Sequence, residues 1–86
     1  MNREPNQAIV VECLRRIAPE IDAESLDTSA ELRDELDLDS MDFLNFVESL
    51  HETTGIDVPE SDYRRLSTVD SCVGYLQRRW NELTPS

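Results

Sequence analysis

Apolar residues recur at helical spacing in three separate segments of this chain, and this periodicity limits the possible folds more than any other feature. Only two glycines, Gly55 and Gly74, occur among the 86 residues, and no alternating strand pattern is bounded by turn residues. We therefore predict an all-α fold: a small bundle of three main helices plus one short helix, with a long loop between the first two helices. The length suits one domain over 1–86, with its core at about 5–80 and a polar tail over 81–86.

The first helix is expected over 5–18, where one proline suits the first turn and another follows the last. A long connection over 19–39 comes next, and single apolar residues in it can peg the loop onto the helices. These residues are Ile21, Leu26, Leu32, Leu36 and Leu38. Within this loop we expect a short turn over 30–36, with Thr28 and Glu31 spaced as a capping box.

The middle helix has clear signals at both ends. We expect it to begin at Ser40, with Asp39 as the N-cap and Asp42 reaching back as in a capping box. It should end near Thr54, where Gly55 supplies the left-handed stop. The residues expected on its core face are Phe43, Phe46, Val47 and Leu50.

Two further helices are expected toward the end of the sequence. One is short, over 59–66, with Pro59 at its first position. Thr68 should cap the other, which reaches about Leu83. The core stripe of this last helix comprises Val69, Cys72, Val73, Leu76 and Trp80.

The outer face of the middle helix carries two apolar residues, Met41 and Leu44, that core packing does not require. They share this face with Asn45, Glu48 and Glu52. Hydrophobic anchors surrounded by charges favour a surface that binds and orients a basic partner. The alternative is that the long loop covers Met41 and Leu44, so that the helix packs on both sides.

Charge narrows the classes of partner. Nineteen Asp and Glu stand against eight basic residues, all of them arginine, for a formal net charge of −11. Such a surface repels phosphate backbones and anionic membranes, so we expect basic protein partners, no nucleic acid and no membrane. No apolar run approaches the roughly 20 residues that span a bilayer, and the first residues do not resemble a signal segment. We expect a cytoplasmic monomer, in which Cys13 and Cys72 are small buried residues of a reducing compartment.

Ser40 is expected at the first turn of the middle helix, between acidic residues. Unpaired backbone N–H groups and the helix dipole favour an anionic group attached there, such as a phosphodiester. No neighbouring His, Lys or Arg can activate the hydroxyl, and His51 is about three turns away. We therefore expect a modified serine, with no catalytic residues and no metal site.

Three stretches of the sequence resemble motifs of the acyl carrier protein family. E-L-D-L-D-S-M-D over 35–42 is similar to the D-L-G-x-D-S-L-D motif around the modified serine of that family. T-G-I-D-V-P over 54–59 resembles its F-G-I-x-I-P segment, and L-S-T-V over 66–69 resembles the start of its last helix. The likeness covers about 10–76 and departs from the family pattern at Asp37, where glycine is usual.

This resemblance implies a free-standing, bacterial-type carrier in which Ser40 holds a 4′-phosphopantetheine arm and Asp39 belongs to the attachment site. A phosphopantetheinyl transferase would install the arm from coenzyme A. The arm would then carry acyl groups as thioesters between acyl-loading and acyl-processing enzymes with basic docking patches, in fatty-acid, polyketide or related specialised synthesis. The residues that the resemblance assigns to the partner face are Met41, Asp42, Leu44, Asn45, Glu48 and Glu52.

Two other functions are open from the residues alone. An acidic adaptor could bind a basic protein surface without any modification. An EF-hand-like calcium site would place Asp37, Asp39 and Glu48 at loop positions one, three and twelve. Position six of that loop would be Asp42, however, where the sharp turn requires glycine.

Overall fold

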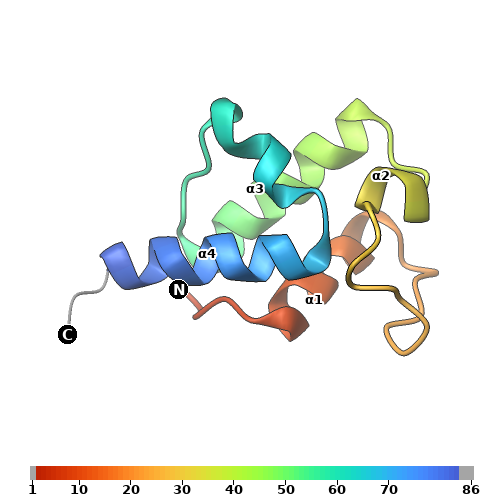
Figure 1. The fold of residues 1–86 in the computed structure, drawn as a ribbon, viewed down its shortest axis with the longest axis horizontal. Coiled ribbons are helices and arrows are strands. Elements are labelled where there is room, and N and C mark those ends of the chain that lie inside the picture. The colour runs from red at the N-terminus through yellow and green to blue at the C-terminus, as the bar shows by residue number, and fades with distance from the viewer. Residues whose placement is uncertain (1, 84–86) are drawn as a thin grey trace.

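Helices make up all the regular structure of residues 2–83, the part of the chain that the computed structural model describes (Figure 1). In chain order they are α1 (Gln7–Ile17), α2 (Leu32–Glu35), α3 (Ser40–Thr54), the 3₁₀ helix η1 (Glu60–Leu66) and α4 (Val69–Leu83). No strand occurs within residues 2–83. The predicted all-α class, with a long loop between the first two main helices, is confirmed.

The predicted boundaries and caps of α3 are confirmed. Asp39 is its N-cap, and the Asp39 Oδ1 atom accepts the Asp42 backbone N–H at 2.8 Å. Asp42 Oδ2 accepts the Asp39 N–H in return at 3.4 Å, which completes the capping box. Gly55 ends the helix in the left-handed conformation, with φ of 77°. The four predicted core residues of α3 are all buried.

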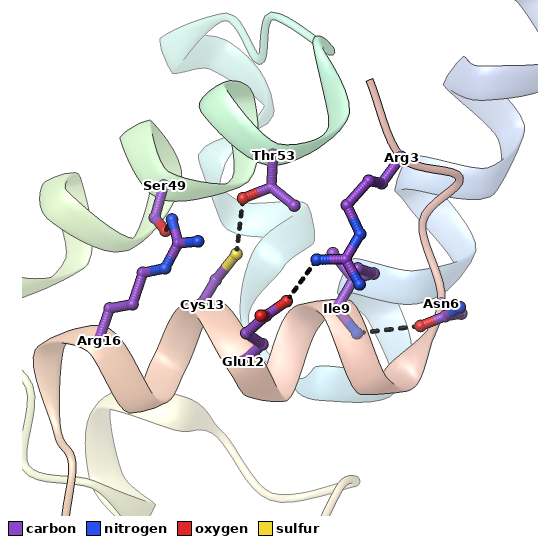
Figure 2. A network of polar contacts seen from close by, with 8 residues as sticks. All are labelled: Arg3, Asn6, Ile9, Glu12, Cys13, Arg16, Ser49 and Thr53. Carbon is purple, nitrogen blue, oxygen red and sulfur yellow. Dashed lines mark hydrogen bonds and ion pairs between the residues drawn. The ribbon is translucent and has the colours of Figure 1, made fainter. Parts of the chain in front are cut away.

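The predicted start of α1 is wrong by two residues. The helix begins at Gln7, and Asn6 is its N-cap. The Asn6 Oδ1 atom accepts the Ile9 backbone N–H at 2.9 Å (Figure 2). A side-chain acceptor at this position satisfies an otherwise unpaired helical N–H, which proline cannot do. Pro5 is instead buried ahead of the helix, where its carbonyl accepts a hydrogen bond from Gln77 at 3.3 Å.

Two other local predictions need correction, and one is confirmed. Pro59 is the N-cap of η1 and not its first residue. The predicted end of the last helix near Leu83 is confirmed, and residues 81–83 are exposed, while residues 84–86 of the predicted polar tail lie outside the described part of the chain. The capping box between Thr28 and Glu31 does not form, because Glu31 is itself the N-cap of α2 and Thr28 lies in the loop before it. Thr28 instead uses its carbonyl to accept the Asp70 N–H at 3.0 Å, which ties the loop to α4.

The long loop is held by the apolar residues predicted to peg it. Ile21, Leu32 and Leu38 are buried, and Leu26 and Leu36 pack partly buried against the core. The Leu32 N–H also donates to the Ser67 carbonyl at 2.7 Å, beside the start of α4. These contacts place the loop, and with it α2, against the end of the bundle where α3 begins.

The core lies where α1 contacts both α3 and α4. Figure 2 shows Cys13 and Arg16 of α1 reaching toward α3, where the Cys13 thiol donates to Thr53 at 3.6 Å and Arg16 to the Ser49 hydroxyl at 3.0 Å. Both cysteines are buried and unpaired, as predicted. In the α4 stripe Val69, Cys72 and Leu76 are buried, whereas Val73 and Trp80 are only partly buried.

Candidate attachment site and partner face

Ser40 is the first residue of α3 and is exposed. Within residues 2–83 its hydroxyl forms no hydrogen bond, so the oxygen is accessible to another molecule. The capping box fixes the helix start around it, because it uses the Asp39 and Asp42 carboxylates on backbone N–H groups. A reactive partner would therefore meet the Ser40 hydroxyl on a preformed helix end.

The electrostatics of this helix end suit a covalently attached phosphodiester. The backbone N–H groups of Ser40 and Met41 have no acceptor among the described residues, and the 15-residue α3 directs the positive end of its dipole toward them. Both groups can donate to an anion on the Ser40 Oγ atom. The two neighbouring carboxylates are engaged in the capping box, so they hold the helix end without covering the hydroxyl. The residues present thus fit such a group.

The outer face of α3 is accessible, and the alternative in which the loop covers it is wrong. The Met41 side chain is 73% exposed and Leu44 is 49% exposed, although both are apolar. Asn45, Glu48 and Glu52 on the same face are exposed, and Asp42 is half-buried. A shallow hollow of about 290 Å³ borders Leu44 and Glu48. The predicted partner-face residues therefore lie along one helix that begins at Ser40.

The described residues offer no cluster of side chains that could hold a metal ion. Between residues 2 and 83 no three His, Cys, Asp or Glu side chains are grouped so as to hold a metal ion. The supposed EF-hand loop is helical from Ser40 onward, so that interpretation is wrong. Burial raises the pKa of the Cys72 thiol to about 12, which keeps it protonated and unreactive at neutral pH. No helix in this part of the chain is long and apolar enough to cross a membrane.

The sequence does not predict one group of residues that lies near Ser40. The Phe43 and Tyr63 rings meet edge to face at 5.9 Å, and the Arg33 guanidinium lies over the Phe43 ring at 4.8 Å from its centroid. With Arg64 they line a pocket of about 330 Å³ between α2, α3 and η1. The periodicity indicates only that Phe43 is a core residue, because contacts between separate elements leave no local signal.

Comparisons with known proteins agree with this geometry. A family model described as "Phosphopantetheine attachment site" matches residues 8–76. The acyl carrier protein of Lactobacillus johnsonii is 33% identical over 61 residues, which cover 71% of this chain and 76% of that protein. The acyl carrier protein of Campylobacter jejuni is 30% identical over 70 residues, covering 81% of this chain and 84% of its own length. No solved structure matches the chain.

Proposed function

This chain belongs to the acyl carrier protein family, the non-catalytic carriers with a phosphopantetheine attachment site, and on that premise we propose that Ser40 bears its 4′-phosphopantetheine arm. One observation supports Ser40 above other serines. Ser40 is exposed and is the first residue of the capped 15-residue helix α3, inside the segment that the family model matches. Asp39 contributes by fixing the helix start. When attached, the arm supplies a thiol that holds acyl groups as thioesters.

In the attachment reaction this chain supplies only the nucleophilic hydroxyl of Ser40. The Ser40 Oγ atom attacks the pantetheine-bearing phosphorus of coenzyme A, an Oγ–P bond forms, and the pyrophosphate P–O bond breaks. Adenosine 3′,5′-bisphosphate leaves, and the hydroxyl proton passes to a base of the transferase. The two carboxylates beside Ser40 are engaged with backbone N–H groups of the capping box, so a phosphopantetheinyl transferase has to supply the base together with Mg²⁺. The chain itself contributes an accessible hydroxyl on a rigid helix end.

The partner face in this proposal consists of Met41, Asp42, Leu44, Asn45, Glu48 and Glu52. Carboxylates on the face steer cationic enzymes toward α3 over a distance, and this attraction weakens as salt screens it. The exposed Met41 and Leu44 side chains then provide short-range apolar contact. The partners we propose are the transferase and the enzymes that load and process acyl groups, each with a basic docking patch.

The proposal also includes the location, oligomeric state and pathway of the carrier. We place the carrier in the cytoplasm as a monomer, in fatty-acid, polyketide or related specialised synthesis. The two unpaired buried thiols suit a reducing compartment.

Intact mass tests the attachment directly. The wild type, Ser40→Ala and Ser61→Ala are each incubated with coenzyme A, Mg²⁺ and a promiscuous phosphopantetheinyl transferase. Ser61 is an exposed serine of η1 and serves as the matched control. We expect the mass of one phosphopantetheine to be added to the wild type and to Ser61→Ala, but not to Ser40→Ala. No gain with a transferase that fully modifies the Lactobacillus johnsonii carrier would refute the attachment at Ser40 and favour an unmodified acidic adaptor.

A further inference from the structure

A wide groove runs along the side of α1 that lies opposite its core residues. It measures about 1030 Å³, and residues of the N-terminal segment, of α1 and of the start of the long loop line it. Its apolar part comprises Ala8, Val11, Pro19 and Ala23. Val11 is buried although it does not belong to the core cluster of the described residues. The groove therefore offers apolar contact that the core does not use.

The charge of this groove is opposite to that of the molecule as a whole. Arg3, Arg15 and Arg16 line it with one carboxylate, Glu12, which gives a formal charge of +2 (three positive, one negative). The whole chain has −11, and 15 of its 19 carboxylates lie between residues 20 and 62. The helix dipole favours Arg15 and Arg16 in the last turn of α1, but Arg3 comes from the segment before the helix. The fold thus gathers three of the eight basic residues on one side of α1.

The guanidinium groups of the groove are available to a ligand. Arg15 is exposed and forms no ion pair among residues 2–83. Arg16 is exposed and donates to the Ser49 hydroxyl at 3.0 Å, a neutral group that leaves the arginine charge uncompensated. Arg3 pairs with Glu12 at 2.9 Å, but their side chains are 55% and 46% exposed. Because such exposed ion pairs contribute little, Arg3 can exchange Glu12 for an external carboxylate.

The groove adjoins the helix that carries the proposed partner face. α1 packs on α3, and the hydrogen bond from Arg16 to Ser49 joins the two helices (Figure 2). Ser49 lies in α3 between Glu48 and Glu52, so a basic surface lies beside an acidic one. A uniformly basic partner would be attracted by α3 and repelled by α1, whereas a partner with an acidic segment beside its basic patch would be attracted by both. Opposite charges on neighbouring helices also determine the orientation of docking.

We infer that the α1 groove binds an acidic, partly apolar segment of the same enzyme that places its basic patch on α3. The carboxylates of that segment pair with the three arginines, and its apolar side chains contact the apolar residues of the groove. This inference rests on the proposed function, because it requires partners that dock on α3. It narrows those partners to enzymes whose docking surface carries both charges, and it assigns part of the specificity to α1.

Three synthetic helical peptides serve as probes, each of about 18 residues with the same stripe of leucine on an alanine background. Glutamate flanks the stripe in the acidic peptide, lysine in the basic peptide and glutamine in the neutral peptide. Each is titrated into the ¹⁵N-labelled protein at an ionic strength of about 0.15 M, where a Debye length of about 8 Å limits repulsion by the rest of the chain. Backbone ¹H–¹⁵N shifts give the place of binding and the Kd. The basic peptide tests the α3 face separately from the groove.

We expect the acidic peptide to shift the backbone amides of α1 and the basic peptide to shift those of α3. Arg15→Gln should raise the Kd of the acidic peptide by about threefold to fivefold, the upper range for one exposed ion pair. Arg78→Gln, which removes an exposed arginine of α4, should leave this Kd unchanged. Glu12→Gln should lower the Kd by a similar factor, because it removes the carboxylate that competes for Arg3. Glu60→Gln, at an exposed position of η1, is the matched control.

Four results would overturn the inference. The acidic peptide could shift η1 and α4 in place of α1, or the neutral peptide could bind as tightly as the acidic one. Arg15→Gln and Arg78→Gln could weaken binding equally. Shifts of α1 and α3 that depend on protein concentration without any peptide would assign the groove to a second copy of this chain. If the basic peptide leaves α3 unshifted while the acidic peptide shifts α1, the proposed partner face is refuted and the acidic-ligand site on α1 is supported.

Discussion

At the scale of single residues, Asp37 shows how this chain departs from its family. Among residues 2–83 it is the one residue other than glycine with positive φ, at 53°. Left-handed backbone costs an L-residue about 1–2 kcal/mol, and aspartate tolerates it better than most. The family usually has glycine there, which pays no such steric penalty. The chain retains an extra carboxylate beside the proposed attachment site at some cost in stability.

Asp37→Gly should therefore raise the free energy of unfolding, by about 0.5–1 kcal/mol, and the melting temperature by about 2–8 °C. Asp37→Asn separates the effect of charge from that of backbone strain, because asparagine is neutral and also tolerates this conformation. Asp34→Gly, within α2, should destabilise by up to about 1 kcal/mol. Thermal melts of the three variants measure this, and equal stabilisation by Asn and Gly would assign the effect to charge.

At the scale of elements, the two glycines provide a matched pair of substitutions. Gly55→Ala places a Cβ in a left-handed residue and against the Asn2 side chain, so we expect a loss of about 1–2 kcal/mol. Gly74→Ala, inside α4, meets nothing within 4 Å and should stabilise by up to about 1 kcal/mol. Urea unfolding measures both. A loss at Gly74 similar to that at Gly55 would contradict this account.

The α3 face supports a prediction about encounter rates. Glu48→Lys should slow association with a cationic partner such as the transferase by about threefold to tenfold at low salt, because it reverses one steering charge. The control is Glu24→Lys, which makes the same charge change in the long loop. Stopped-flow association at low and high ionic strength measures both. Equal slowing by the two variants would exclude a specific role for Glu48.

The elements predicted best from sequence are those whose ends carry local side-chain signals. Asp39, Asp42 and Gly55 determine α3 within a few residues of its ends, and its boundaries were predicted correctly. Pro5 was assigned to α1 wrongly, because the contact that holds it comes from Gln77, 72 residues later. Thr28 likewise contacts Asp70 and not Glu31. The pocket around Arg33 could not be predicted, since three separate elements build it.

At the scale of the whole molecule, charge repulsion limits stability. Ion pairs within residues 2–83 join only three arginines to three carboxylates, against 19 carboxylates in the sequence. Raising ionic strength from about 0.01 M to about 0.15 M shortens the Debye length from about 30 Å to about 8 Å. We expect the melting temperature to rise by about 4–8 °C, and further with Mg²⁺ at equal ionic strength. A melting temperature that changes with neither ionic strength nor Mg²⁺ would contradict this account.

The contacts of the N-terminal segment also bear on when the protein matures during biosynthesis. Arg3 donates its backbone N–H to the Thr53 carbonyl, and Gln77 of α4 donates to Pro5. Because α4 follows α1 in the chain, α1 lacks its full set of neighbours until α4 has left the ribosome. Because domains fold as units, the nascent chain should expose the apolar side of α1 until then. We therefore expect Ser40, the proposed attachment residue, to become a transferase substrate on a folded helix end only after α4 has docked.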